Sequence, residues 1–346
     1  MSGTDARQLI YDLTFPELER MVAALDEPKF RAAQIWEGLY KSHWSKIEHF
    51  SNLSKALRQQ LESKFIFQSL TIERTLASSD SETTKVLFHT PDSRAIETVL
   101  MRYDRRRTLC ISTQSGCAMG CTFCATGQMG LGRNLSSGEI VEQVMHFSRE
   151  LHEENEKVTN IVFMGMGEPF HNYDATIDAI ERLNDKKGLN LGARRFTVST
   201  VGLIPGIKRF TAENRQVNLA VSLHAVDDEL RSSMIPINEK YPVNDLLEAC
   251  REYTEGTGRR ITFEWALIEG ENDSTQQAAH FAKAIEGMLC HVNLIPLNPT
   301  KGFSGKRSSR ERVKAFQDVL TSNGIPCTIR VRRGIDILAG CGQLAN

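Results

Sequence analysis

The sequence lacks long apolar runs and an N-terminal leader pattern. No stretch reaches the roughly 18 consecutive apolar residues of a membrane-spanning helix, and residues 1–7 contain neither a basic nor an apolar segment. Contents of 40% hydrophobic and 25% charged residues are ordinary for a globular protein and give no sign of disorder. We therefore expect a soluble protein of the cytoplasm with no membrane partner.

Excess charge and internal repeats are also missing. The chain has 42 lysine and arginine residues against 43 aspartate and glutamate residues, a formal net charge of −1. A nucleic-acid ligand would therefore have to be bound by local basic patches. The length of 346 residues is about twice that of a usual domain, so we expect one large domain with an appendage, or two domains.

Three of the eight cysteines, Cys117, Cys121 and Cys124, lie within eight residues in a C-x3-C-x2-C pattern. This density fits a metal site in a reducing compartment better than a disulfide framework. No second pair follows at a zinc-finger distance, and three unrelated buried thiols are a poor explanation for a glycine-rich loop. A [4Fe–4S] cluster usually takes one thiolate per iron, so this triplet would leave one iron open.

The apolar pattern changes along the chain and predicts three parts. Residues 1–68 show helical stripes and predict an N-terminal helical domain. Residues 69–101 read as extended segments separated by polar turns, a β connector. Residues 102–346 alternate short apolar runs with helical stretches and end in a C-terminal tail.

The third part predicts an α/β fold, a partial (β/α)6 TIM-like barrel. The helices expected between its strands include 136–151, 173–186, 243–256, 274–288 and 308–323. The six expected strands are 109–112, 160–164, 195–200, 217–223, 261–268 and 291–295. Barrels of this kind carry their chemistry on loops at the carboxyl ends of the strands, where the cysteine loop also lies.

Several motifs resemble known families. The triplet with Phe123 before its last cysteine resembles the cluster loop of radical S-adenosylmethionine (SAM) enzymes. Other motifs resemble the RlmN/Cfr family of rRNA adenosine methyltransferases: Met164-Gly-Met-Gly-Glu-Pro169, Val221-Ser-Leu-His-Ala225, Met234-Ile-Pro-Ile-Asn238 and Gly340-Cys-Gly-Gln-Leu344. The resemblance covers nearly the whole chain, including residues 28–36 and 96–99. It implies that the helical domain 1–68 binds RNA and that the barrel domain 102–346 ends in a catalytic tail.

The resemblance implies two cofactors, a [4Fe–4S] cluster on the three cysteines and SAM on the open iron. It also implies that the SAM site is lined by Gly167, Glu168, Ser199, Ser222, Leu223, His224 and Asn298. Without the family, the G-x-G at 165–167 would indicate only a tight turn, and His224 would more often be a structural histidine.

The resemblance further implies a methyl carrier and two helpers. Cys341, in a glycine-flanked tail that we expect to be flexible, would carry the methyl group as S-methylcysteine. The carrier would form a transient crosslink to C2 of an adenosine in 23S rRNA and, in some members, in tRNA. Cys110 would resolve the crosslink by forming a disulfide with Cys341, and Glu97 would take the ring proton. On their own, Cys110 reads as a core residue and Glu97 as part of a solvated strand face.

Local basic clusters give modest support for RNA binding, among them residues 102–107, 301–312 and 330–333. The family also implies an electron donor such as flavodoxin or ferredoxin, whereas the sequence leaves the oligomeric state open. Two alternatives stay open as well. One is a Cfr-type C8 methyltransferase, and the other is a non-enzymatic iron–sulfur protein that carries electrons or binds RNA.

Overall fold

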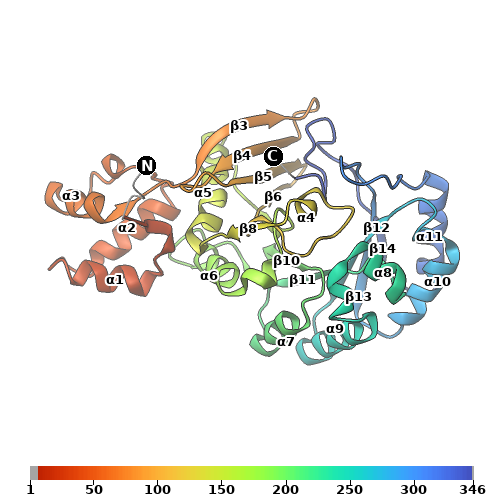
Figure 1. Ribbon diagram of the computed structural model, residues 1–346. Helices are drawn as coiled ribbons and strands as arrows, with labels where there is room; N and C mark the ends of the chain where they lie inside the picture. The colour runs from red at the N-terminus through yellow and green to blue at the C-terminus, as the bar shows by residue number, and fades with distance from the viewer. Residues whose placement is uncertain (1–6, 345–346) are drawn as a thin grey trace.

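A computed structural model describes residues 7–344 of the chain. In this range, no helix is both long and apolar enough to cross a membrane. An N-terminal helical lobe lies beside a large curved sheet that is covered by helices on its outer side (Figure 1). This arrangement confirms the predicted α/β fold with a helical N-terminal region.

The N-terminal lobe contains three α-helices within the described residues, as the apolar stripes predict: α1 (Phe15–Ala23), α2 (Phe30–Tyr40) and α3 (Lys55–Lys64). Thr14 begins α1 through a capping box with Glu17, which satisfies backbone donors of the first turn. Trp36 and Tyr40 of α2 are fully buried and anchor the lobe's core. Short elements complete the lobe: β1 (Gln8–Leu9), β2 (Phe65–Ile66) and the 3-10 turns η1 (Ile10–Asp12) and η2 (Ile47–His49).

Ten strands of the described chain form one sheet in the order β14-β13-β12-β11-β10-β9-β6-β5-β4-β3. The antiparallel part contains β3 (Thr71–Ala77), β4 (Thr83–His89) and β5 (Ala95–Tyr103). The parallel part contains β6 (Arg106–Cys110), β9 (Asn160–Phe163), β10 (Phe196–Thr200), β11 (Asn218–Ser222), β12 (Ile261–Leu267), β13 (Cys290–Pro296) and β14 (Cys327–Ile329). The predicted connector strands thus extend the barrel sheet, and β14 adds a parallel strand that the pattern did not predict.

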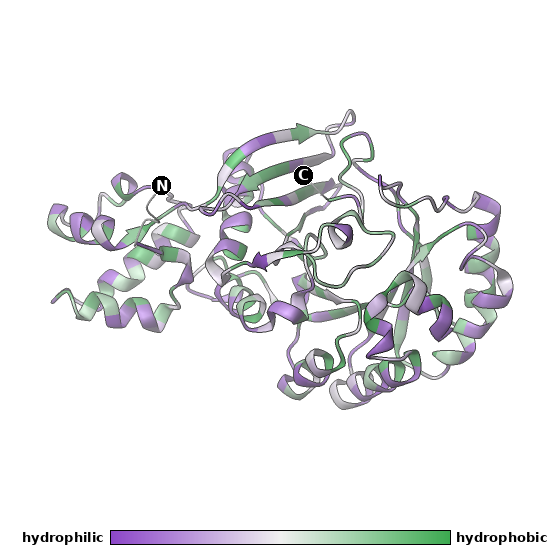
Figure 2. Cartoon of the chain, viewed as in Figure 1, coloured by the Kyte–Doolittle hydropathy of each residue, from purple (hydrophilic) through white to green (hydrophobic). Residues whose placement is uncertain are grey.

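Amphipathic helices cover the outside of the parallel strands, with polar residues turned outward (Figure 2). They are α5 (Ser137–Glu153), α6 (Tyr173–Asn184), α7 (Ile204–Glu213), α9 (Val243–Thr257), α10 (Thr275–Ala284) and α11 (Arg310–Ser322). Five of them match the expected ranges to within a few residues, and α7 is additional. Shorter elements at the loops are α4 (Ala125–Gln128), α8 (Asp228–Met234), η3 (Pro169–Asn172), η4 (Ala193–Arg195) and η5 (Pro236–Glu239).

A small hairpin holds the base of the cysteine loop. Its strands, β7 (Gln114–Gly116) and β8 (Leu131–Asn134), lie on either side of the loop. Gly116 has a φ of 74°, and a Cβ atom there would lie 2.0 Å from the carbonyl oxygen of Gly130. Only glycine allows this close approach of two backbone segments.

Gln143 of α5 ties the helix to the strand that leads into this loop. Its amide nitrogen donates to the carbonyl of Ser112 at 2.9 Å, and its amide oxygen accepts from the N–H of Ser112 at 2.9 Å and the hydroxyl of Thr98 at 2.7 Å. Gln143 is fully buried, so water cannot replace these bonds.

We expect Gln143→Leu to destabilise the protein by roughly 2–4 kcal/mol, because it leaves several buried backbone and hydroxyl groups unsatisfied. Urea denaturation should show a lower midpoint, whereas Gln59→Leu, an exposed position on α3, should change it little. Equal midpoints for the two variants would contradict this account.

Candidate active site

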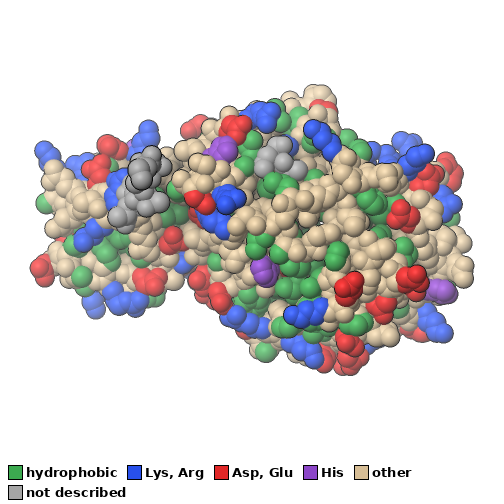
Figure 3. Space-filling model, viewed as in Figure 1, with side chains coloured by type: hydrophobic (Ala, Val, Ile, Leu, Met, Phe, Trp, Pro, Cys, Tyr) green, Lys and Arg blue, Asp and Glu red, His purple; other side chains and the backbone are tan. Residues whose placement is uncertain are grey.

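A cavity opens at the carboxyl ends of the parallel strands, inside the curved sheet. It is lined by the cysteine loop and by residues of β9, β10, β11, β12 and β13 or the loops that follow them. In the view of Figure 3, lysine and arginine side chains lie mainly around the periphery of the molecule, and hydrophobic side chains gather nearer the centre. The position agrees with the expectation that a barrel places its chemistry at this edge.

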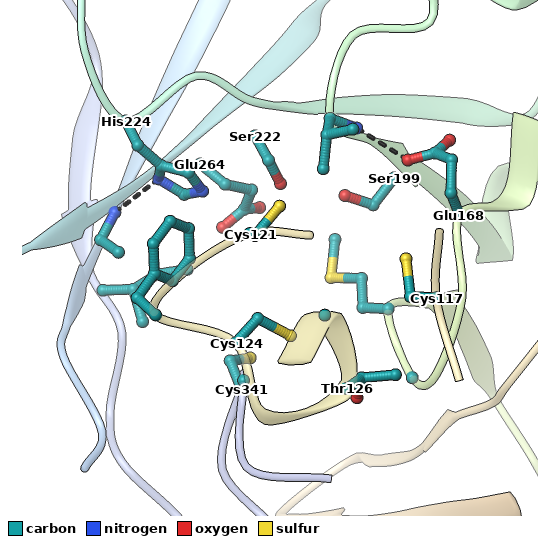
Figure 4. A pocket seen from close by; sticks show the side chains of 18 of the residues that line it. Cys117, Cys121, Cys124, Thr126, Glu168, Ser199, Ser222, His224, Glu264 and Cys341 are labelled. Atoms are coloured by element: carbon teal, nitrogen blue, oxygen red, sulfur yellow. Dashed lines mark hydrogen bonds between the residues drawn. The ribbon is translucent and has the colours of Figure 1, made fainter. Parts of the chain in front are cut away.

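Cys117, Cys121 and Cys124 all line this cavity (Figure 4). Burial raises the pKa of Cys117 to about 12 and also raises the pKa of Cys121 and Cys124. A bound cation reverses this effect because it stabilises the thiolate. In residues 7–344, no three His, Cys, Asp or Glu side chains surround a single metal-ion position. Thiolates that each bind a different iron need no such common point, so the triplet fits a multi-iron cluster.

The loop around the cysteines is held by its own backbone and by α8. The N–H of Cys124 donates to the carbonyl of Cys121 at 3.2 Å, and the N–H of Thr122 donates to the carbonyl of Met234 at 3.0 Å. The side-chain amide of Gln128 donates to the carbonyl of Thr122 at 2.7 Å. These bonds hold the cysteine loop against α8.

Glu168 is buried in the loop after β9, directly before η3, and joins this loop to the one after β10. Its carboxylate accepts from the N–H of Phe170 at 3.0 Å and from the N–H of Val201 at 2.9 Å. Burial nevertheless raises its pKa to about 7. Gly167, just before it, has a φ of 104°, and a Cβ there would lie 2.6 Å from the Cβ of Gln114.

Ser199, Ser222 and His224 also line the cavity. Nδ1 of His224 accepts from the N–H of Ala266 at 2.9 Å, and burial lowers the pKa of His224 to about 3. The imidazole is therefore neutral, with its proton on Nε2. The ring also meets the edge of Phe123 at a centroid distance of 5.0 Å.

Leu223 differs from the other residues predicted to bind SAM. Its side chain is fully buried in the main hydrophobic core and does not line the cavity. Its N–H donates to the carbonyl of Glu264 at 3.1 Å, and its own carbonyl accepts from Arg231 at 3.0 Å. The side chain of Leu223 thus contributes to core packing, and its role in SAM binding stays a prediction.

A second cavity lies beside the first and is lined by Cys110, Met101, Tyr103 and part of the C-terminal segment. Cys341, Asn298 and Arg330 line both cavities and therefore form their common wall. Figure 4 shows Cys341 next to Cys124, across the first cavity from Ser199 and Ser222. The sequence alone placed Cys341 only in a glycine-flanked C-terminal tail.

The C-terminal segment is docked, although its glycines predicted flexibility. Asn298 donates to the carbonyl of Cys341 at 3.1 Å, and the N–H of Ala125 donates to the carbonyl of Gly342 at 2.8 Å. The hydroxyl of Thr126 donates to the carbonyl of Leu344 at 2.5 Å. These bonds attach the tail directly to the cysteine loop.

Cys110 is buried beside Val99 and Met101, and the structure assigns it to a small hydrophobic cluster. Burial and the neighbouring Cys341 raise its pKa to about 12. All eight cysteines lie within the described residues and are free thiols, so the predicted Cys110–Cys341 disulfide is not present.

Glu97 lines neither cavity. It is buried rather than solvated, and its carboxylate pairs with Nζ of Lys85 at 2.7 Å. Lys85 also donates to the carbonyl of Leu338 in the C-terminal segment at 3.2 Å. The structure therefore brings Glu97 near the tail but not to the cavity lining.

Two residues of the site were not recognised in the sequence. Glu264 lines the first cavity, and burial raises its pKa. A carboxylate within the otherwise mostly apolar β12 was the available signal. Arg330 had been grouped with RNA-contacting arginines, but it lies between the cavities, where negative charge on Cys341 raises its pKa.

Several other basic residues that were candidates for RNA contact are engaged within the protein. Arg102 and Arg107 both pair with Glu156, and Arg312 pairs with Asp273. Arg333 pairs with Glu82. These ion pairs reduce the charge that the corresponding clusters offer to phosphate groups.

The three clustered cysteines, the carboxyl-edge cavity and the partial barrel define a radical SAM enzyme. The family model of the radical SAM superfamily matches residues 111–282, and enzymes of this class use a [4Fe–4S] cluster and SAM. A second model, the ribosomal RNA large subunit methyltransferase N-terminal domain, matches residues 9–66.

Similar proteins are found over the whole chain. It is 48% identical to a probable dual-specificity RNA methyltransferase RlmN of Chloroflexus aurantiacus, over 98% of this chain and 93% of that protein. It is 46% identical to the dual-specificity RNA methyltransferase RlmN 1 of Myxococcus xanthus, over 99% of this chain and 95% of that protein. A solved radical SAM methyltransferase from Sphaerobacter thermophilus is 50% identical, with a TM-score of 0.95 over 97% of this chain and 99% of that one. The chain belongs to the RlmN family of radical SAM RNA methyltransferases.

We expect alanine at Cys117, Cys121 or Cys124 to abolish the cluster, since each thiolate binds its own iron. Iron analysis after anaerobic reconstitution should give about four irons per chain for the wild type and little for each variant. Cys250→Ala, in the core of α9, should retain the iron. Stoichiometric zinc in protein purified without air would contradict the assignment.

Proposed function

We propose that this protein methylates C2 of an adenosine in 23S rRNA and in tRNA, with Cys341 as the methyl carrier. The observation that carries the proposal is the position of Cys341 in the wall between the two cavities. From there it adjoins the cysteine loop on one side and Cys110 on the other. The names of the relatives, dual-specificity RNA methyltransferases, support two kinds of RNA substrate.

The cofactors would lie in the first cavity. Bound there, the cluster and SAM supply both the methyl group and the radical chemistry that an aromatic carbon without a lone pair requires. Cys117, Cys121 and Cys124 would hold the cluster, while Gly167, Glu168, Ser199, Ser222, His224 and Asn298 would orient SAM. The Nε2–H of the neutral His224 can donate a hydrogen bond without adding a positive charge.

The second cavity would receive the target base, which must be unstacked to reach Cys341. Its wall offers an aromatic ring, Tyr103, and three arginines, Arg330, Arg332 and Arg333. Aromatic rings and guanidinium planes suit stacking on a base. Arg332 also donates to Asn298 at 2.9 Å, which links this cavity to the carrier tail.

Cys110 would release the product. Its thiolate attacks the sulfur of Cys341, an S–S bond forms, and the bond from that sulfur to the methylene carbon breaks. The electron pair goes to the carbon, which takes up a proton and becomes the methyl group. The resulting disulfide must then be reduced by an external thiol before another turnover.

Reduction of the cluster would require an electron donor, for which a flavodoxin or ferredoxin is suited. Because the substrates are ribosomal and transfer RNA, we place the enzyme in the cytoplasm. The direct test of the function is mass analysis of digested rRNA and tRNA from cells that lack their own C2 enzyme but express this chain. 2-Methyladenosine is expected, whereas 8-methyladenosine or neither product would refute the proposal.

Cys341→Ala and Cys110→Ala should fail at different steps. We expect Cys341→Ala to keep its iron but transfer no methyl group, because the carrier sulfur is missing. Cys110→Ala should accumulate a covalent protein–RNA adduct, visible as a shifted band on a denaturing gel. Methylation by Cys341→Ala would exclude the carrier mechanism.

Glu97→Gln should slow turnover strongly if Glu97 takes the C2 proton, since glutamine keeps the shape but cannot act as the base. Single-turnover assays should show the adduct persisting, with iron content and SAM binding unchanged. Lys85→Met is the matched control, because it breaks the same ion pair but leaves the carboxylate. If both variants lose activity and stability equally, Glu97 is only the structural partner of Lys85.

A further inference from the structure

Arg231 on α8 is a buried cation with neutral partners. Its side chain donates to the carbonyls of Leu223 at 3.0 Å, Val201 at 2.6 Å and Ser222 at 3.2 Å. A fourth bond runs to the amide oxygen of Asn238 at 2.8 Å. Only 1% of the residue's surface is exposed.

Among the described residues, no carboxylate forms an ion pair with Arg231. Asp228, on the same helix, acts on Arg231 electrostatically but forms no ion pair with it. Its carboxylate is exposed, so water screens its charge, and it already accepts from Asn238 and from the N–H of Val243. A buried charge without an opposite charge costs several kcal/mol, even when it is hydrogen-bonded. The arrangement therefore calls for a negative charge close to the guanidinium.

The cysteine loop lies next to α8 and can supply that charge. Cys121 packs in one hydrophobic cluster with Met234 and Ile235, at the end of α8. Thr122, the next residue, donates its N–H to the carbonyl of Met234 at 3.0 Å. Val201 and Ser222, whose carbonyls accept from Arg231, line the same cavity as Cys121.

We propose that Arg231 is the buried counter-charge of the iron–sulfur cluster and raises its reduction potential. A [4Fe–4S] cluster with three thiolates is anionic, and one-electron reduction adds a further negative charge. A fixed cation in a low-dielectric site stabilises the more negative, reduced state. Arg231 is thus a positioning residue that acts through the cluster and does not touch the RNA.

The same side chain also holds the ends of β10 and β11 through Val201 and Ser222. A neutral replacement would therefore change both charge and backbone bonding. Two variants separate these effects. Arg231→Lys keeps the charge but makes fewer hydrogen bonds, whereas Arg231→Gln keeps hydrogen-bond donors but removes the charge.

The test is a dithionite titration of reconstituted holoenzyme without SAM, followed by the EPR signal of the reduced cluster. We expect Arg231→Gln to have a more negative midpoint potential than the wild type, and Arg231→Lys to stay close to the wild type. Arg182→Met is the matched control. Arg182 is another buried arginine that donates to the carbonyls of Leu13 and Asp12, but it lies on α6 and not at the cysteine loop. Its replacement should leave the potential unchanged.

Thermal unfolding of the apo and holo forms gives a second readout. Arg231→Gln removes the uncompensated buried charge that destabilises the apo protein. The increase in Tm on cluster insertion should therefore be smaller for Arg231→Gln than for Arg231→Lys. If Arg231→Gln does not bind a cluster, the proposal is tested by comparing the Tm of its apo form with the Tm of apo Arg231→Lys. A higher apo Tm for Gln supports the counter-charge, and a lower one overturns it. Equal midpoint potentials in Arg231→Gln and the wild type would also overturn it, whichever adenine carbon the enzyme methylates.

Discussion

The ends of parallel strands carry backbone groups that must be hydrogen-bonded even where they border a buried cavity, and this requirement organises the site. Buried polar side chains meet it: Gln143 at Ser112, Glu168 at Val201, and Arg231 at Ser222 and Leu223. Each bond joins one strand end to a different loop or helix. These bonds tie the cavity wall to the surrounding loops and helices.

The antiparallel strands also help to position the site, because they hold the C-terminal segment. The C-terminal segment lies over them: Asp336 accepts from the N–H of Ser79 at 2.8 Å, and Lys85 donates to the carbonyl of Leu338. A Cβ at Gly334 would lie 2.7 Å from Cγ2 of Thr83, so the contact is close. The tail is thus held at both the sheet and the cysteine loop, which places Cys341 between the two cavities. The proposed role of Cys341 as methyl carrier, with a cofactor on one side and a base on the other, requires such a position.

Burial also sets the charges of the site. Carboxylates and imidazole lose their charge most readily: burial raises the pKa of Glu168 to about 7 and lowers that of His224 to about 3. Arginine retains its charge because its intrinsic pKa is so high. Arg231 and Arg330 therefore leave a positive field around a cavity whose cofactors and substrate are anionic or electron-rich.

The sequence by itself determined the local features of this protein. The spacing of Cys117, Cys121 and Cys124 indicated the cluster, and apolar periodicity located the helices and six parallel strands, because both signals depend on neighbouring residues. It did not reveal the helix α7. It also did not reveal that β14 and the connector strands pair into the barrel sheet, since strand pairing depends on partners far away in the chain. Tertiary structure alone decided that Cys341 lies between two cavities, that Glu97 pairs with Lys85, and that Arg231 is buried beside the cysteine loop. These facts depend on burial and on contacts between distant segments, which create the low-dielectric surroundings that give the same residue types different charges and roles.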